Sequence, residues 1–459
     1  MRQEVNRRTF VKTGLVAAST LATAQTWAKP VGPNDRVRMG FIGIGNRGTQ
    51  LLRLFMEQPD VDVVALCDIY DPFLQRDNSR IDPAWLQRVG PRLPNMTEKF
   101  AKPPKRYTDY RKLLDDPEID AVCIATPDHW HAIQSIDAMH AGKDVYCEKP
   151  LTITIAEGRR MVQVQKETNR IAAVGLNRRG NPAYLKLAEI LHKGGLGDIR
   201  AGAAIRVSNM FPDGIGKSAE VAPPAGFDWN AWLGPRAFRP YKYTYAPYFF
   251  RWHNDFSSQM GNWGVHYMDA IRWMMQEQAP CAISAHGSKM IDHDGEISDN
   301  MNVTFEFASG RMIDFRILEA CGGPEFPFGE IELRGTKGVA YANEQGFRIT
   351  ASKPGQFQTW KKPIEDQEFM VQEKGLSDGS SSVSTNGLIR DFVACVKSRK
   401  APLCPLEEGH RSTSFAHLAN IALKMKQRLE WDAAAERFTN CEAANALLHY
   451  TYREGYRLG

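Results

Sequence analysis

Apolar positions in the first third of the chain form short continuous runs, each followed by a stretch at helical spacing. The run over residues 37–44 precedes Leu51, Leu52 and Phe55, which share one helix face. Further apolar runs lie in DVVALCDIYD (residues 62–71), IDAVCIATP (residues 119–127) and DVYCEKP (residues 144–150). Strands that alternate with helices predict an α/β fold with a doubly wound parallel sheet, whose ligands bind at the carboxyl ends of the strands.

The second half of the chain shows an alternating pattern instead. In MNVTFEFASGRMIDFRI (residues 301–317) apolar residues occupy every second position on both sides of a Ser-Gly-Arg turn, which predicts a β-hairpin. GEIELRGTKGVAYA (residues 329–342) repeats this strand and turn pattern. Residues 387–426 return to helical spacing, and the aromatic, basic segment 449–459 is expected to pack back on the body.

Composition bounds the class of protein. The chain has 459 residues, of which 43% are hydrophobic and 24% charged, so it is globular and long enough for two domains. Its formal charge is +5, but much of that excess lies before residue 25, and the remainder is close to neutral. This balance gives no reason to expect a nucleic acid or an anionic membrane surface as partner.

The first residues are typical of an export signal. Adjacent arginines in NRRTFVK precede a short apolar stretch that ends in Ala22-Thr23-Ala24, a run too short to span a bilayer. This pattern resembles a twin-arginine (Tat) signal, with Asn6 in place of the usual Ser or Thr. We therefore expect residues 1–28 to be a signal, removed after Ala24 or Ala28, and the mature protein to be soluble and periplasmic or otherwise exported. The eight cysteines form no C-x-x-C pair, and Cys67 and Cys123 lie in apolar runs, so buried free thiols are favoured over a disulfide framework.

A glycine motif follows the first apolar run. In GFIGIGNRG the spacing Gly43-x-Gly45-x-x-Gly48 lies between a predicted strand and a predicted helix, which is the context of a dinucleotide-binding turn. Asp68 ends the second strand, where a carboxylate accepts hydrogen bonds from the adenosine ribose and repels a 2′-phosphate, so NAD is favoured over NADP. The expected cofactor-binding residues are Gly43, Gly45, Asn46, Arg47, Gly48, Asp68, Thr126, Pro127, His131, Glu148 and Lys149.

Three motifs in order, GIGNRG, ATPDHWHA and CEKPLT, resemble the glucose-fructose oxidoreductase and inositol dehydrogenase family (Gfo/Idh/MocA). GLNRRGNPAYLKLAEILHKGGLGDIR and SSQMGNWGVHYMDAIRW also resemble segments of that family, so the similarity spans nearly the whole chain. It implies a Rossmann domain over about residues 35–155. It also implies a C-terminal α/β domain over residues 156–459, with a large open, mostly antiparallel sheet that often serves oligomerisation.

The resemblance also implies the reacting groups. Lys149 matches the lysine of the family's E-K-P motif, whose bond to the following proline is often cis, and His266 matches the catalytic histidine. Asn262 stands where most family dehydrogenases carry Asp, and an amide cannot act as a general base. His266 together with Lys149 is therefore the acid/base candidate.

Other residues are candidates with open alternatives. Asp269 lies one helical turn after His266 and is either structural or a substrate contact. The segment 227–256 holds twelve aromatic residues, which either stack on sugar rings or pack on one another. Arg178, Tyr184, Arg251 and His253 are further substrate candidates. His129 and His131 have metal-ligand spacing, but no further ligands appear, so no metal is expected and His131 is placed near the nicotinamide instead.

Two enzymatic functions follow from these observations. The first is an NAD-dependent oxidoreductase that acts on a sugar or glycoside and keeps its cofactor tightly bound, since an exported enzyme has no pool of free NAD. The second is a redox-neutral glycoside hydrolase that uses transient oxidation and elimination, as in exported NAD-dependent α-N-acetylgalactosaminidases, although their motifs correspond poorly to PDHWH and NWGVH. A non-catalytic binding protein is a third possibility, and the expected partners are a carbohydrate, the Tat machinery and further copies of the chain.

Overall fold

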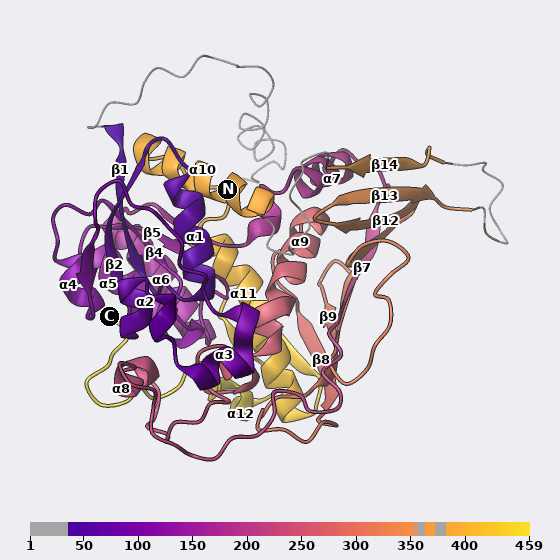
Figure 1. The fold of residues 1–459 in the computed structure, drawn as a ribbon. Helices are drawn as coiled ribbons and strands as arrows, with labels where there is room; N and C mark the ends of the chain where they lie inside the picture. The colour runs from indigo at the N-terminus through magenta and orange to yellow at the C-terminus, as the bar shows by residue number, and fades with distance from the viewer. Residues whose placement is uncertain (1–34, 354, 356–362, 372–381) are drawn as a thin grey trace, which may run out of the picture. The chain divides into compact units, whose positions relative to one another are not determined.

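Six parallel strands form the first sheet of the computed structural model, which describes residues 35–353, 355, 363–371 and 382–459. The strand order is β3-β2-β1-β4-β5-β6, at the left of Figure 1. The strands are β1 (Val37–Ile42), β2 (Val61–Cys67), β3 (Lys105–Tyr107), β4 (Ala121–Ile124), β5 (Asp144–Cys147) and β6 (Ala172–Val174). All residues of β4 and β5 are buried, as expected of parallel strands covered on both faces. The predicted doubly wound sheet is confirmed.

Helices connect these strands as the spacing predicted. They are α1 (Asn46–Met56), α2 (Asp71–Gln75), α3 (Pro83–Val89), α4 (Tyr110–Leu114), α5 (His131–His140) and α6 (Ile155–Thr168). α6 begins at a capping box, in which Thr154 accepts the Glu157 N–H and Glu157 accepts the Thr154 N–H. The sheet continues to β6, beyond residue 155, where the sequence interpretation places the domain boundary.

Within the described residues, the second sheet has ten strands in the order β14-β13-β12-β11-β7-β10-β9-β8-β15-β16. β7 and β10 run parallel, and the other neighbours are antiparallel. The strands are β7 (Ile199–Val207), β8 (Ala282–Ser288), β9 (Asn300–Glu306), β10 (Met312–Leu318), β11 (Ile331–Gly335), β12 (Gly338–Asn343), β13 (Gly346–Ala351), β14 (Gln367–Met370), β15 (Leu429–Asp432) and β16 (Arg437–Phe438). Both predicted hairpins are confirmed, with Val303 opposite Phe315 in the first and Ile331 opposite Ala342 in the second.

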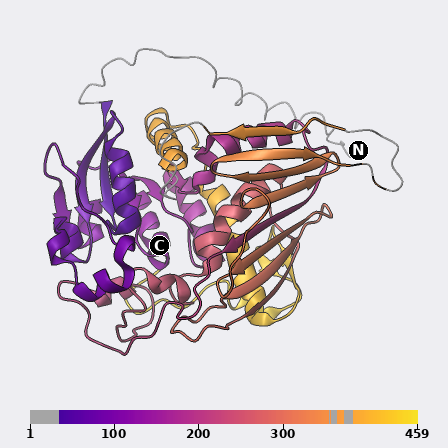
Figure 2. The same cartoon turned by 45° about the vertical axis from the view of Figure 1, so that its right-hand side comes forward.

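Helices cover one face of this sheet, as Figure 2 shows. They are α7 (Pro182–His192), α9 (Val265–Met275) and α11 (Leu406–Met425). α11 contacts helix α6, which connects β5 and β6 of the first sheet, and it also contacts β8 of the second sheet. The alternate buried residues of β9 and β10 therefore face a helical layer that also contacts the Rossmann part.

The C-terminal residues return to the first sheet. The predicted helical region over 387–426 is observed as α10 (Ser382–Ser398) and α11. Phe392 of α10 packs edge-on against Phe55 of α1, with ring centroids 6.3 Å apart. After the short α12 (Glu442–Asn445), the Tyr452 hydroxyl donates to Glu157 Oε1 at 2.7 Å, which confirms that the tail packs back on the body.

All eight cysteines are described, and all are free thiols, five of them buried. Within the described residues, no helix is both long and apolar enough to cross a membrane. The predicted signal over residues 1–28 lies outside the described residues.

Candidate functional site

The three glycines of the β1–α1 turn serve different purposes. Gly43 has φ +80°, and a Cβ there would lie 2.8 Å from the backbone nitrogen of Thr126. A Cβ on Gly48 would lie 2.0 Å from the carbonyl oxygen of Gly43, so these two glycines are required for close packing. A Cβ on Gly45 would meet only the Phe73 ring, at 3.7 Å, which leaves the backbone at Gly45 open to a ligand.

The second strand presents a carboxylate to this turn. Asp68 directly follows β2, and its Oδ2 accepts the Ile44 N–H at 2.8 Å while Oδ1 accepts the Tyr70 N–H at 2.9 Å. Burial raises the pKa of the Asp68 carboxyl, against the opposing effect of these N–H groups and of Arg76. The side chain is thus fixed at the edge of the turn, where it can accept further hydrogen bonds from a ribose.

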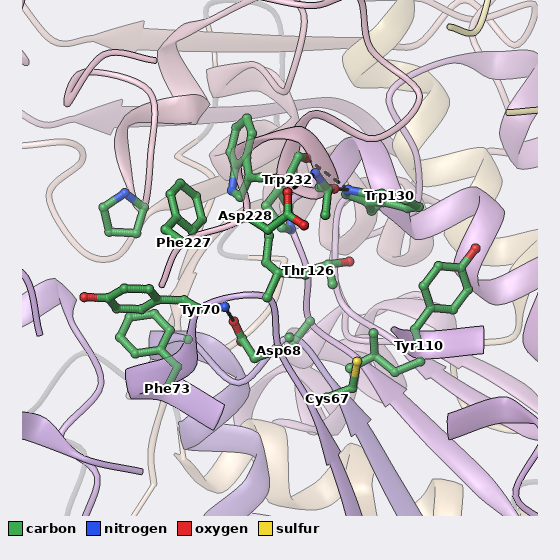
Figure 3. A pocket seen from close by; sticks show the side chains of 18 of the residues that line it. Cys67, Asp68, Tyr70, Phe73, Tyr110, Thr126, Trp130, Phe227, Asp228 and Trp232 are labelled. Atoms are coloured by element: carbon green, nitrogen blue, oxygen red, sulfur yellow. Dashed lines mark hydrogen bonds between the residues drawn. The ribbon is translucent and has the colours of Figure 1, made fainter. Parts of the chain in front are cut away.

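A cavity of about 470 Å³ opens in front of the turn and Asp68. Among the residues expected to bind the cofactor, it is lined by Gly43, Gly45, Asn46, Arg47, Asp68, Thr126 and Pro127. Arg251, which was expected to contact the substrate, also lines it. Figure 3 shows Tyr70 and Phe73 on one side of Asp68 and Tyr110 on the other, with Trp130 and Trp232 across the cavity. The other expected cofactor-binding residues do not line the cavity: Gly48 packs beneath the turn, and His131, Glu148 and Lys149 are also absent from the lining.

The wall of the cavity opposite the glycine turn is formed largely by the aromatic-rich residues 227–256. His129 Nε2 and Trp130 Nε1 both donate to the Trp232 carbonyl oxygen, at 2.8 and 3.0 Å. This pair of bonds attaches helix α8 (Trp229–Leu233) to the loop after β4. Trp229 stacks on Trp232, and most aromatic side chains of residues 227–256 are buried against one another or against Tyr70 and Trp85. Mutual packing, rather than sugar stacking, accounts for most of these residues.

The cavity fits a dinucleotide. The N-terminus of α1 has no side-chain cap and lines the cavity with Gly45, Asn46 and Arg47, so its N–H groups and helix dipole face the space where a pyrophosphate belongs. Asp68 lies beside it at the position that holds the adenosine ribose in Rossmann folds. Because Gly45 has no side chain, the space beside its backbone stays open for the pyrophosphate.

Lys149 follows β5 at the end of the same sheet. Its Nζ donates to the Asn262 backbone oxygen at 2.8 Å and to the Asn262 side-chain oxygen at 3.2 Å. Asn262 lies in η7 (Met260–Gly264), a π-helical turn directly before α9, and donates its own amide to Gln259 Oε1 at 3.1 Å. Burial, together with Arg251 and Arg47, lowers the pKa of Lys149 to about 8, although Glu148 and Asp128 oppose the shift.

His266 lies in the first turn of α9, buried and close to this lysine. Its Nδ1 has no hydrogen-bond partner within the described part of the chain. Burial lowers the pKa of His266 well below its usual value, and Arg178, Lys149 and Arg47 add to the effect. The imidazole is therefore neutral at pH 7 and able to accept a proton.

An ion pair between Arg47 and Glu148 connects the ends of β1 and β5. Arg47 Nε donates to Glu148 Oε1 at 2.9 Å, and its Nη2 donates to the Thr385 hydroxyl of α10 at 3.2 Å. The Glu148 side chain is only 5% exposed, whereas that of Arg47 is 26% exposed, so the carboxylate is the enclosed partner of this ion pair. It holds the first turn of α1 against the segment that carries Lys149.

The two histidines of DHWHA contact carbonyl oxygens. His131 Nδ1 lies 2.7 Å from the Pro150 oxygen and its Nε2 lies 2.8 Å from the Thr126 oxygen. Both nitrogens must donate, which requires the imidazolium form. Burial opposes protonation, but Cys147, Asp128 and the Pro150 carbonyl raise the pKa of His131 to about 10. His131 thus joins the loop after β4 to the cis Lys149-Pro150 turn.

The predicted substrate residues separate into three groups. Arg178 and Tyr184 converge on Glu330, which accepts from Arg178 Nε at 2.8 Å and from the Tyr184 hydroxyl at 2.9 Å. The Arg178 guanidinium also lies over the ring of Tyr267, 4.8 Å from its centroid, so this group adjoins the turn of α9 that carries His266. Arg251 instead lines the cofactor cavity, with its guanidinium over the Tyr248 and Phe250 rings.

His253 and Asp269 lie elsewhere. Asp269 is 0% exposed and accepts from Arg179 Nη2 at 2.8 Å and from the Ser412 hydroxyl at 2.6 Å. His253 is 1% exposed and contacts the Thr244 carbonyl at 2.8 Å. Asp269 therefore fits the structural alternative of its prediction, because its carboxylate is engaged by Arg179 and Ser412. The buried His253 also makes an internal contact, and its role in substrate binding stays a prediction.

Sequence reasoning missed several residues of this region. Asp128 is buried beside the Ser257 hydroxyl, which donates to it, and Glu330 holds Arg178. Asp228 and Tyr456 line the cavity from distant parts of the chain. Asp128 was visible as the acidic residue of a strand-end motif, whereas Glu330 and Tyr456 gave no local signal.

Family models match three successive parts of the chain. Residues 37–176 match the oxidoreductase family with an NAD-binding Rossmann fold, residues 231–341 match the GFO/IDH/MocA C-terminal domain, and residues 357–458 match the oxidoreductase family C-terminal α/β domain. The chain belongs to the Gfo/Idh/MocA family. Its first sheet is accordingly an NAD-binding Rossmann domain.

Curated Gfo/Idh/MocA relatives match only part of the chain. An inositol 2-dehydrogenase from Salmonella typhimurium is 32% identical over 163 residues, covering 35% of this chain and 43% of that protein. A glycosyl hydrolase family 109 protein from Shewanella pealeana is 28% identical over 229 residues, covering 45% and 47%. The chain therefore spans about half the length of the curated relatives it matches.

Solved structures share the fold of this chain. A levoglucosan dehydrogenase in complex with NADH and levoglucosan is 17% identical, with a TM-score of 0.62 over 86% of this chain and 99% of that one. An aldose-aldose oxidoreductase from Caulobacter crescentus has a TM-score of 0.59 at 17% identity, with the same coverage. At these identities the likeness shows the architecture alone.

Proposed function

We propose that this protein is an NAD-dependent oxidoreductase that acts on a hydroxyl or keto group of a sugar or glycoside. The observation that carries the proposal is the arrangement at the end of β5, where Lys149, held by Asn262, and the neutral His266 lie next to the NAD-binding turn. The inositol 2-dehydrogenase relative supports a polyol or sugar as substrate.

The residues divide the chemistry between them. Bound NAD supplies the hydride acceptor. His266 is neutral near pH 7, and its free Nδ1 takes the proton of the substrate hydroxyl. Lys149, cationic below its pKa of about 8, stabilises the negative charge that develops on the substrate oxygen. Asn262 accepts hydrogen bonds from Lys149 and adds no charge, so it orients the lysine without neutralising it.

A second candidate is a redox-neutral glycoside hydrolase. It is supported by the similarity to glycosyl hydrolase family 109 proteins and by the amide at position 262. In this reaction bound NAD would take a hydride from one substrate carbon and give it back at the end of the cycle. Between these two steps the neighbouring carbon loses a proton to His266, the aglycone leaves with its bonding electrons, and water adds to the resulting double bond. The products show no net change of oxidation state.

We also propose that the protein is exported and that it assembles with further copies of itself. The twin-arginine pattern supports export of a folded protein that carries its cofactor, with the Tat machinery as partner. The large sheet supports assembly of several copies. A binding protein without catalysis is disfavoured, because Lys149 and His266 have perturbed pKa values beside a cofactor cavity.

The test incubates the purified protein with a panel of free sugars and glycosides. Absorbance near 340 nm follows bound NADH, and mass spectrometry follows the product. NADH together with a keto-sugar lighter by two hydrogens establishes the dehydrogenase. Release of an aglycone without net NADH establishes the hydrolase, and purified protein that binds no NAD eliminates both.

A further inference from the structure

Two oppositely charged side chains hold the same residue of the glycine turn. Asp68 Oδ2 accepts the Ile44 N–H at 2.8 Å, and Arg76 Nη1 donates to the Ile44 carbonyl oxygen at 3.1 Å. Arg76 follows α2 with a left-handed backbone, φ +60°, which turns its side chain back toward α1. A cation thus lies beside the acidic residue that faces the adenosine ribose.

That position has a known chemical meaning. In Rossmann folds an arginine near the end of the second strand accommodates the 2′-phosphate of NADP, whereas the acidic residue selects the ribose hydroxyls of NAD. A guanidinium binds phosphate well when two of its N–H groups are free to form parallel hydrogen bonds. From its location alone, Arg76 would favour binding of NADP, whose 2′-phosphate Asp68 repels.

Glu98 resolves this conflict. Its carboxylate is 1% exposed, and Oε2 accepts from Arg76 Nη2 at 2.7 Å and from Arg76 Nε at 3.1 Å. Its other oxygen accepts from Arg53 Nε of α1 at 2.9 Å. Glu98 is therefore a buried anchor that fixes the guanidinium against the outer side of the turn.

The remaining donors of Arg76 are also engaged. Its Nη2 donates to the Thr49 hydroxyl at 3.0 Å, and its Nη1 contacts the Phe73 carbonyl at 3.5 Å in addition to Ile44. With the two bonds to Glu98, all five N–H groups have an acceptor. The Arg76 side chain is 7% exposed, so no pair of donors faces the cavity.

We propose that Glu98 is a specificity-determining residue for the cofactor: it holds Arg76 away from the adenosine ribose and thereby removes the cation that would bind a 2′-phosphate. The inference rests on the proposed NAD-dependent function, but it concerns nucleotide binding and not turnover. Asp68 repels the phosphate directly, and Glu98 acts through Arg76.

The experiment measures equilibrium binding of NAD⁺ and of NADP⁺ by titration calorimetry, after the nucleotide carried through purification has been released and identified by chromatography. Glu98→Gln keeps the shape of the side chain and removes its charge. We expect the NADP⁺/NAD⁺ affinity ratio to rise about 10-fold or more, the size of one charge-assisted phosphate contact. The ratio should return to the wild-type value in Glu98→Gln/Arg76→Gln. Asp71→Asn, which removes a nearby exposed acid that pairs with Arg80, should leave the ratio unchanged.

The outcomes are distinguishable. Equal weakening of both nucleotides in Glu98→Gln, or an unchanged ratio, overturns the inference and leaves Glu98 a structural residue. Wild-type protein that binds neither nucleotide overturns the proposed function itself.

A second comparison keeps Glu98 in place, in case Glu98→Gln does not fold. With Glu98 present, Asp68→Ser should gain little NADP⁺ affinity, and adding Arg76→Gln should change it little. Strong NADP⁺ binding by Asp68→Ser that Arg76→Gln abolishes would show that Glu98 does not restrain Arg76, which contradicts the inference.

Discussion

Lys149 Nζ donates to both oxygens of Asn262, the backbone oxygen at 2.8 Å and the side-chain oxygen at 3.2 Å. The lysine is therefore held by neutral acceptors. This arrangement leaves its pKa at about 8, since burial is not offset by a directly bonded carboxylate.

Removal of the lysine amine tests its role. Lys149→Met should retain the fold and bound NAD but lose about 10²- to 10⁴-fold in kcat/KM, because the charge next to the substrate oxygen is gone. Steady-state kinetics with a substrate found by the panel, together with the nucleotide content of the purified variant, provides the measurement. Lys112→Met, at an exposed position of α4, is the matched control, and turnover of Lys149→Met equal to that control would exclude a catalytic lysine.

The pH dependence follows from the same pair. If Lys149 acts as a cation, kcat/KM of the wild type should fall as the pH rises through about 8. Asn262→Asp places a carboxylate beside the ammonium group, which favours its charged form and should move the falling limb upward by about 1–3 pH units. A pH profile of each protein decides this. A limb that rises through pH 8 would instead identify neutral Lys149 as the base.

Gly48 and Gly45 make a matched pair of substitutions. Gly48→Ala brings a Cβ within 2.0 Å of the Gly43 oxygen and should lower the melting temperature as well as NAD affinity. Gly45→Ala meets only Phe73 at 3.7 Å, so it should fold normally and lose NAD affinity alone. Thermal unfolding and NAD titration separate the two effects. Normal NAD binding by Gly45→Ala would place the pyrophosphate elsewhere.

Asp269 is expected to act in stability. Asp269→Asn leaves Arg179 and Arg272 with less compensating charge in the interior and should reduce the free energy of unfolding by about 3–5 kcal/mol. Denaturant unfolding measures the loss, and KM of the remaining folded enzyme should be unchanged. A raised KM with normal stability would restore Asp269 as a substrate contact.

His131 should remain an imidazolium at neutral pH. We expect nitrogen-detected NMR to show both ring nitrogens protonated at pH 8, in keeping with a pKa of about 10. His131→Asn leaves a carbonyl oxygen of Thr126 or Pro150 without its donor, which should cost about 1–3 kcal/mol of stability. A neutral ring at pH 8 would disprove the double donation.

The sequence predicts the parts of this site that depend on local order. The glycine spacing, the apolar runs and the acidic residue after β2 are each read within one segment, and parallel topology then brings the strand ends together. Helical spacing alone left the role of Asp269 open, because the sequence does not show that the face it shares with His266 also meets Arg179 and Ser412 from other segments.

Contacts between distant segments could not be read in this way. Arg178 and Glu330 are 152 positions apart, and nothing in the β11 pattern singles out that glutamate as the partner of an arginine. The sequence shows that residues 227–256 are rich in aromatic residues, but it does not show which parts of the chain their rings contact. Only the tertiary packing shows that Phe227 meets Tyr70 and Trp85 of the Rossmann domain.

The Trp232 carbonyl, which accepts from both His129 and Trp130, makes the cofactor cavity a joint product of two regions matched by different family models. A chimera that took residues 37–176 from a relative would exchange the glycine turn but retain this chain's α8. That helix packs against His129 and Trp130 of the present chain, not against the residues of the relative. Cofactor affinity therefore depends on residues of both regions, and exchanging the first region alone does not transfer it.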